Sequence, residues 1–194
     1  MIPSRFRAGW TSALTLALFC AASSFGAPNT PTYVGAKKCK PCHLKQYTTW
    51  SGTKMANAFE LLKPGVRADA KRKGNQDPNK DYTHDAKCLP CHTTGYGKAG
   101  GFRSIEETPE LAGVQCETCH GAHSDVLKVM TIKNKAYKRS EVVTAGLEVP
   151  GEKTCTGQCH NTKSPMVPPN YTFDYAKRKT TGTHQHIPLK YPHD

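Results

Sequence analysis

Four short motifs in the sequence combine two cysteines with a histidine that directly follows the second cysteine. Two thiols at this spacing can each add to one vinyl group of the same haem, and the adjacent imidazole can then ligate the haem iron. The pattern C-x-x-C-H occurs at residues 39–43, 88–92 and 116–120, and a fourth copy with one extra residue between the cysteines occupies residues 155–160. The motifs predict four covalently attached haems.

Each motif offers two thiols for attachment and one proximal imidazole. The cysteines expected to hold haem are Cys39, Cys42, Cys88, Cys91, Cys116, Cys119, Cys155 and Cys159. The expected proximal ligands of the iron are His43, His92, His120 and His160. Zinc sites and disulfides also use closely spaced cysteines, but neither needs a histidine directly after every second cysteine. Haem attachment is the favoured interpretation, with zinc or disulfides as the alternative.

The first 27 residues have the composition of a secretory signal peptide. Two arginines precede an apolar run over residues 13–22 that is short for a membrane span, and small residues follow up to Ala27. We expect residues 1–27 to be removed on export, which places the mature chain in the periplasm or outside the cell. Cys20 leaves lipid attachment as the alternative. Removal of this segment leaves eight of the nine cysteines, and the four motifs use all eight.

Residues 28–194 are expected to form a single domain with four haems. The sequence is 37% hydrophobic and rich in lysine, proline and glycine, so the polypeptide alone can bury only a small core. The porphyrins must then supply much of the apolar interior. No run shows the alternating pattern of a strand. The predicted fold class is mainly α: a small multihaem cytochrome c fold, with short helices and coil around four closely packed haems and little or no sheet.

Helical spacing of apolar residues predicts a few short helices around the motifs. One is expected from His43 to Trp50, and a second is expected to carry Met55, Phe59 and Leu62. Thr83 is expected to cap a short helix that carries the second motif, and Thr108 with Pro109 to begin one that carries the third. A further helix is expected over residues 124–132. Residues 67–80 show no packing pattern and are predicted to be a connector.

The formal net charge of +12 suggests an anionic partner. Haem propionates would neutralise part of this charge, and the remaining lysines favour docking to an acidic redox protein. The basic residues are not interleaved with aromatic ones as in nucleic-acid-binding surfaces, so no nucleic acid is expected as a partner. No stable membrane insertion is expected for the mature chain.

On these motifs the sequence resembles the tetrahaem cytochrome c-554 family, known from ammonia oxidisers. The resemblance runs from about residue 34 to residue 122 and resumes at residues 171–173, and residues 50–64 and 116–121 are among its most specific segments. It implies a periplasmic electron carrier with four haems, three with two histidine ligands and one with an open position. The family also resembles tetrahaem cytochromes that polymerise into extracellular filaments.

Five histidines outside the proximal positions are candidate distal ligands: His84, His123, His184, His186 and His193. His123 follows a haem histidine by three residues in a glycine-bearing turn, so it points towards another haem or into solvent. His184 and His186 are too closely spaced for both to face one iron, which suggests one ligand and one bystander. His84 is a ligand or a surface residue, and His193, beside the terminus, is suited to an intermolecular contact.

The resemblance adds an expectation for three of these positions. It implies that His123 serves the fourth haem and that either His184 or His186 serves the first. It also places a histidine where this chain has Met55, as the ligand of the haem on His120. Three alternatives remain open: ligation by the Met55 thioether, a vacant iron position, or packing of Met55 against the porphyrin with His84 or the His193 of a neighbouring subunit as the ligand.

Three functions are compatible with these features. The first is a non-enzymatic electron carrier, since the recognisable chemistry is haem ligation and no acid–base pair marks a substrate pocket. The second is a haem enzyme that acts on a small nitrogen compound, such as nitric oxide or hydroxylamine, at one open haem. The third is a subunit of a conducting cytochrome filament, which requires self-association.

Overall fold

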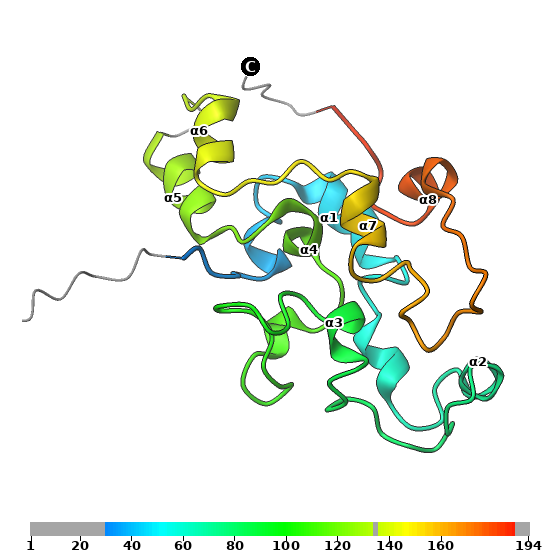
Figure 1. Ribbon diagram of the computed structural model, residues 1–194. Helices are drawn as coiled ribbons and strands as arrows, with labels where there is room; N and C mark the ends of the chain where they lie inside the picture. Colours follow the sequence, from blue (N-terminus) through cyan, green and yellow to red (C-terminus); the bar gives the residue numbers. More distant parts are fainter. Residues whose placement is uncertain (1–29, 134–135, 189–194) are drawn as a thin grey trace, which may run out of the picture.

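The computed structural model describes residues 30–133 and 136–188 (Figure 1). This part of the chain forms short helices joined by turns and coil, and its strand-like pairing is a single antiparallel bridge between Thr93 and Ala112. The α-helices are α1 (Leu44–Ser51), α2 (Ala68–Lys73), α3 (Leu89–His92), α4 (Cys116–His120), α5 (Ser124–Lys133), α6 (Arg139–Thr144), α7 (Glu152–Thr156) and α8 (Tyr175–Thr181). The predicted mainly α fold class is confirmed.

Three single turns of 3-10 helix complete the secondary structure: η1 (Ala36–Lys38), η2 (Phe59–Leu62) and η3 (Pro109–Leu111). Four helices follow a cysteine motif or carry part of one: α1, α3, α4 and α7. Figure 1 shows these four in the middle of the molecule, with α2, α5, α6 and α8 around them. The central elements are thus the ones that carry the candidate chemistry.

The helix predicted from His43 is present as α1, and the one predicted over residues 124–132 is present as α5. In α1 the rings of Tyr47 and Trp50 pack with centroids 5.4 Å apart. The indole Nε1 of Trp50 donates to the carbonyl oxygen of Val114 at 3.0 Å. Because Val114 comes just before the third motif, this bond ties the helix after the first motif to the third motif.

The prediction of a continuous second helix through Met55 and Leu62 is wrong. The chain makes turns up to Ala58 and only then forms η2. The hydroxyl of Thr53 accepts from the backbone N–H of Ala56 at 3.2 Å, and the Asn57 amide donates to the carbonyl oxygen of Thr53 at 3.0 Å. Side chains that bond nearby backbone groups in this way compete with the helical ladder.

The prediction of an unpacked connector over residues 67–80 is also wrong, because this segment contains α2. Lys71 of α2 is buried, with 6% of its surface exposed. Its ammonium group donates to the carbonyl oxygen of Lys63 at 2.6 Å and lies 5.3 Å from the ring centroid of Tyr82. The long methylene stem of a lysine can be buried when its charged end finds such partners.

Two predicted helix starts differ from the structure. Thr83 does not cap a helix: its backbone N–H donates to the Asp81 carboxylate at 2.8 Å, and the second motif begins in a turn instead. Thr108 does precede a helical turn, but this is the single turn η3 and the third motif lies on the separate helix α4. The hydroxyl of Thr108 accepts from the backbone N–H of Arg103 at 2.9 Å rather than from the turn that follows it.

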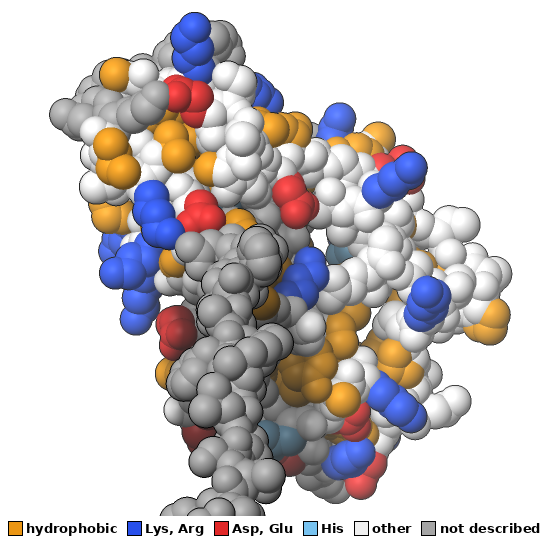
Figure 2. Space-filling model, turned by 60° about the vertical axis from the view of Figure 1, so that its left-hand side comes forward, with side chains coloured by type: hydrophobic (Ala, Val, Ile, Leu, Met, Phe, Trp, Pro, Cys, Tyr) orange, Lys and Arg blue, Asp and Glu red, His pale blue; other side chains and the backbone are white. Residues whose placement is uncertain are grey.

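The apolar core of the described chain is small. One cluster beside the second motif contains most of it: Phe59, Leu62, Tyr82, Leu89, Phe102 and Leu111. Lys and Arg side chains are spread over the face seen in Figure 2, with fewer Asp and Glu between them. Within the residues that the structure describes, no helix is both long and apolar enough to cross a membrane. A core of this size is too small to stabilise the centre of the molecule through apolar side chains alone.

Candidate haem-binding motifs

The first and fourth motifs close in the same way despite their different lengths. In the first, the backbone N–H of His43 donates to the carbonyl oxygen of Cys39 at 3.0 Å, and in the fourth that of His160 donates to Cys155 at 3.0 Å. The second bond spans one residue more, as in a single-turn π-bulge. The extra residue is therefore absorbed within the turn, and the histidine keeps the same relation to the first cysteine.

The cysteines of different motifs lie against one another in pairs. The neighbouring thiol of Cys116, together with burial, raises the pKa of Cys39. The neighbouring thiol of Cys159 lowers the pKa of Cys91 to about 7, and the Cys91 thiol donates to the carbonyl oxygen of Gln158 in the fourth motif at 3.7 Å. The first motif is thus next to the third, and the second is next to the fourth.

The third and fourth motifs are also neighbours. Burial raises the pKa of Cys119 to about 11, and the nearby thiol of Cys155 adds to this rise. The amide of Gln158, the residue before Cys159, donates to the carbonyl oxygen of Pro90 at 2.7 Å and joins the fourth motif to the second. These contacts arrange the four motifs in one continuous series: first, third, fourth and second.

The four histidines predicted to be proximal ligands are held in the neutral form that binds metal. Burial is the main cause that lowers the pKa of each of them: His43, His92, His120 and His160. In the second motif, the Nδ1 atom of His92 lies 2.6 Å from the carbonyl oxygen of Ala58. A ring that donates through Nδ1 leaves Nε2 free for a metal, which is the usual arrangement of metal-bound histidine.

The distal candidate His123 shares this arrangement. It is buried, with 8% of its surface exposed, and its Nδ1 atom lies 2.6 Å from the carbonyl oxygen of Gly121. Its positive charge, when present, lowers the pKa of both His43 and His120, so it lies close to these two proximal residues. Burial and the positive charge of Arg178 lower the pKa of His160.

The remaining candidates are placed differently from one another. His184 lies beside His120, with ring centroids 6.4 Å apart. His186 has its Nε2 atom 3.0 Å from the carbonyl oxygen of Lys179. The side chain of His84 is 63% exposed and lies near the carboxylate of Glu106. His193 lies outside the described residues.

Met55 lies beside the third motif through its backbone. Its carbonyl oxygen accepts from the N–H of Val114 at 2.9 Å and from that of Ala58 at 3.1 Å. The side chain is partly buried. The structure therefore keeps residue 55 next to the segment that leads into Cys116.

Two buried polar side chains that the sequence analysis did not identify join the start of the described chain to the third motif. Glu117, 1% exposed, accepts from the N–H groups of Val34, Gly35 and His123 at 2.8–3.0 Å. The side-chain oxygen of Gln115 accepts from the N–H of Ala36 at 2.7 Å. The sequence signal is weak, since Glu117 occupies a position of the motif that haem attachment leaves unrestricted.

An aromatic residue supports the fourth motif. The ring of Phe173 stacks on the imidazole of His160, with centroids 4.3 Å apart and planes inclined by 25°. A ring packed at this distance restricts rotation of the imidazole about its bond to the chain. Nothing in the spacing of the sequence indicates this contact, because thirteen residues separate the two rings along the chain.

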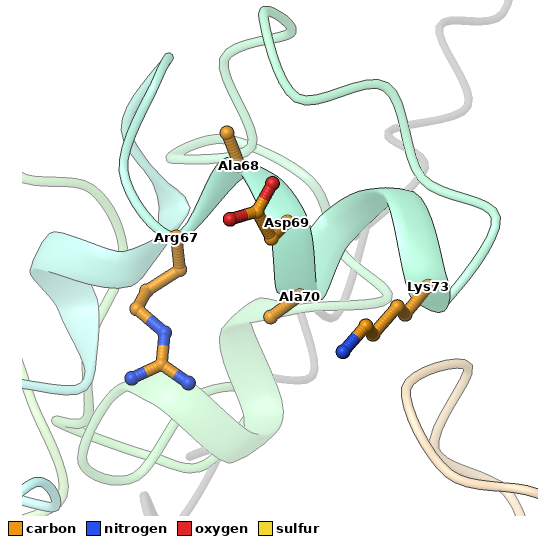
Figure 3. A pocket seen from close by; sticks show the side chains of 5 residues that line it. All are labelled: Arg67, Ala68, Asp69, Ala70 and Lys73. Atoms are coloured by element: carbon orange, nitrogen blue, oxygen red, sulfur yellow. The ribbon is translucent and has the colours of Figure 1, made fainter.

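The hollow in Figure 3 lies away from this chemistry. It is lined by Arg67, Ala68, Asp69, Ala70 and Lys73 beside α2. The lining includes no cysteine or histidine, so the hollow is not a haem site.

The residues of the motifs fit covalent haem. Each motif brings two thiols and a neutral imidazole together on about one turn of chain. The helices beside the motifs lie in the middle of the molecule, and the apolar core of the described chain is small. Among the residues described, no group of three or more Cys, His, Asp and Glu side chains is arranged to hold a bare metal ion. The donor set suits a metal already carried by a porphyrin.

Comparison with known proteins agrees with this chemistry. The sequence model of the family described as cytochrome c554 and c-prime matches residues 38–121. Cytochrome c-554 of Nitrosomonas europaea is 32% identical over 198 residues, covering 90% of this chain and 84% of that protein. The solved structure of the reduced state of cytochrome c554 from Nitrosomonas europaea superposes with a TM-score of 0.72 at 31% identity, covering 83% of this chain and 88% of the other. The chain therefore belongs to the cytochrome c554 family of tetrahaem c-type cytochromes, and its cofactor is covalently bound haem c.

Proposed function

We propose that the mature protein is a periplasmic or extracellular electron carrier with four haems, which passes single electrons between redox proteins. The observation that carries this proposal is that the four motifs are neighbours in one series, with hydrogen bonds from Gln158 to Pro90 and from Cys91 to Gln158 between the fourth and second motifs. Haem c supplies a reversible one-electron change between ferric and ferrous iron when it is bound. The protein's part is to hold four such groups close together in a fixed order.

The motif residues are assigned the attachment roles. The thiols of Cys39, Cys42, Cys88, Cys91, Cys116, Cys119, Cys155 and Cys159 would form the thioether bonds. The imidazoles of His43, His92, His120 and His160 would be the proximal ligands, and their burial keeps them neutral for that role. His123, buried with Nε2 free, is assigned a distal position.

Intact mass and a pyridine haemochrome assay of the exported protein test this proposal. We expect a chain that begins near residue 28 and carries four haems, because the widened fourth motif closes on His160 as the first closes on His43. The variant Cys155→Ala/Cys159→Ala should carry three haems. Three haems on the unaltered chain, or zinc in place of iron, would contradict the assignment.

A basic surface around the first motif suits an acidic redox partner. Residues 30–59 contain no Asp or Glu, and Cys42 is the one motif cysteine that is exposed rather than partly buried. Leu44, next to the motif, is 56% exposed. The exposed lysines of this basic surface are Lys37, Lys38, Lys40 and Lys45. An apolar contact at the centre of a positive rim is an arrangement that guides and then holds an acidic protein face.

Charge reversal tests the basic surface. We expect Lys40→Glu/Lys45→Glu to slow oxidation of the reduced protein by ferricyanide, an anion, several-fold at low ionic strength, since steering of this kind can change association rates by about 10-fold or more. Oxidation by the cationic tris(phenanthroline)cobalt(III) should change in the opposite direction. Both effects should shrink as salt is added, because the screening length is about 10 Å at 0.1 M.

The control is Arg67→Glu/Lys73→Glu, which alters the net charge equally. Figure 3 shows these two side chains beside α2, and Figure 1 shows α2 at the edge of the molecule, away from α1. An equal response of the two double variants would assign the effect to net charge and not to the basic surface.

A further inference from the structure

Lys71 in α2 is a buried cation that forms no ion pair within the described part of the chain. Only 6% of its surface is exposed. Its ammonium group donates to the carbonyl oxygen of Lys63 at 2.6 Å and lies 5.3 Å from the ring centroid of Tyr82. Both partners attract a positive charge without neutralising it. A lysine buried to this extent is rarely left without an acidic partner, which points to a role for the charge itself.

The nearby carboxylate of Asp81 is bound elsewhere. It accepts from the backbone N–H of Thr83 at 2.8 Å and from the Thr83 hydroxyl at 2.7 Å. These bonds are the main cause that lowers the pKa of Asp81, and the charges of His84 and Lys71 lower it further. Asp81 is exposed, so water solvates its charge. The positive charge of Lys71 is therefore not cancelled by this neighbour.

The Tyr82 ring connects Lys71 to the start of the second motif. The carbonyl oxygen of Tyr82 accepts from the N–H of Asp85 at 3.0 Å, and that of Asp85 accepts from the N–H of Cys88 at 2.9 Å. Tyr82 also belongs to the apolar cluster that contains Leu89 of the motif, and Cys88 packs against this cluster. The ammonium group thus lies on the same small apolar core as the second motif.

The single turn η2 connects Lys71 to the histidine of the same motif. Lys63, whose carbonyl oxygen receives the ammonium group, directly follows η2. Ala58, which directly precedes η2, has its carbonyl oxygen 2.6 Å from the Nδ1 atom of His92. The buried charge and the predicted proximal ligand are therefore held by the two ends of one helical turn.

A second lysine near the Tyr82 ring is compensated. The ammonium group of Lys80 lies 4.8 Å from the ring centroid, but its side chain is 54% exposed and pairs with the Asp85 carboxylate at 3.2 Å. Burial is the main cause that raises the pKa of Cys88, and the charges of Lys80 and Lys71 oppose this rise, so both act on the motif. Because Asp85 offsets Lys80, the charge that is both buried and unpaired is that of Lys71.

We propose that the buried charge of Lys71 raises the reduction potential of the haem held by the second motif. The inference rests on the proposed attachment of a haem to Cys88 and Cys91. Ferric iron carries one positive charge more than ferrous iron, so a nearby cation in a low-dielectric interior disfavours the oxidised form. The second motif ends the series of first, third, fourth and second. Lys71 thereby favours the presence of an electron at this end of the series.

A redox titration followed by the visible haem bands tests the proposal. We expect Lys71→Met, which removes the charge but keeps a long side chain, to shift one of the four potentials downward. Lys71→Arg should keep that potential close to the unaltered value, because it keeps the charge. The matched control Lys63→Met removes a charge from a side chain that is 48% exposed and pairs with Glu60 at 2.6 Å. Solvent and Glu60 already offset this charge, so the control should shift the potentials much less.

Variants that lack one haem identify which potential moves. The shift caused by Lys71→Met should persist in each protein whose first, third or fourth motif has its cysteines changed to alanine, and disappear in Cys88→Ala/Cys91→Ala. The proposal is overturned if Lys71→Met leaves all four potentials unchanged, if Lys71→Arg lowers one of them equally, or if the shift persists without the second haem. A Lys71→Met protein with fewer than four haems would also overturn it, since Lys71 would then have a structural role. Fewer than four haems in the unaltered protein would instead contradict the proposed function.

Discussion

The chain made without haem attachment is expected to show no cooperative unfolding transition. Among the described residues only ten apolar side chains are buried, and six of them form one cluster beside the second motif. Full burial of such a side chain contributes about 1.5–3 kcal/mol, whereas ordering the backbone costs about 1–2 kcal/mol for each residue. The polypeptide alone therefore lacks the apolar interior that would stabilise residues 30–188.

The test uses a variant in which all eight motif cysteines are changed to alanine. It is exported and purified in parallel with the unaltered protein. Its far-UV circular dichroism should be that of a largely unfolded chain, and its signal should change gradually with urea. The haem-bearing protein is the control and should unfold in a sigmoidal transition. If the alanine variant also unfolded in a sigmoidal transition, with a similar dependence of the unfolding free energy on urea, the polypeptide would form a stable core without haem.

Features that depend on local pattern were predictable from the sequence. The motifs, the helix after the first of them and α5 follow from residue types at fixed spacing, and so does the lack of sheet in the described chain. The family was predictable as well, because residues 50–64 and 116–121 carry its specific features, and the family's sequence model matches residues 38–121. Spacing also predicts one ligand and one bystander for His184 and His186, and that stays a prediction.

Features that depend on long-range contacts were not predictable. The helix expected at Met55 is replaced by turns because Thr53 and Asn57 bond the backbone, and the spacing of apolar residues does not report such competition. The pairing of the first motif with the third joins Cys39 to a residue far along the chain. Glu117 was missed because its role is to receive N–H groups from segments distant in sequence.

Replacement of Glu117 by alanine is expected to lower the free energy of unfolding by about 3–5 kcal/mol. The carboxylate is 1% exposed and accepts from the backbone N–H groups of Val34, Gly35 and His123. Without it, the buried N–H groups of Gly35 and His123 and the partly buried N–H of Val34 lose their acceptor, and each buried loss costs about 1–3 kcal/mol. Urea denaturation of the haem-bearing protein, followed by circular dichroism and by the Soret band, measures the change.

Two further variants separate the acceptor role of Glu117 from its charge. Glu117→Gln keeps one oxygen that can accept but turns an amide N–H towards a donor, so its midpoint should fall between those of the unaltered protein and Glu117→Ala. Glu107→Ala is the matched control, because that carboxylate is half exposed and pairs with Arg103 at 2.9 Å on the surface. A surface pair of this kind contributes about 0.3–0.5 kcal/mol. If Glu117→Ala shifted the midpoint no more than Glu107→Ala does, the three N–H groups would have found other acceptors, and Glu117 would not be what holds the N-terminal segment and His123 to the third motif.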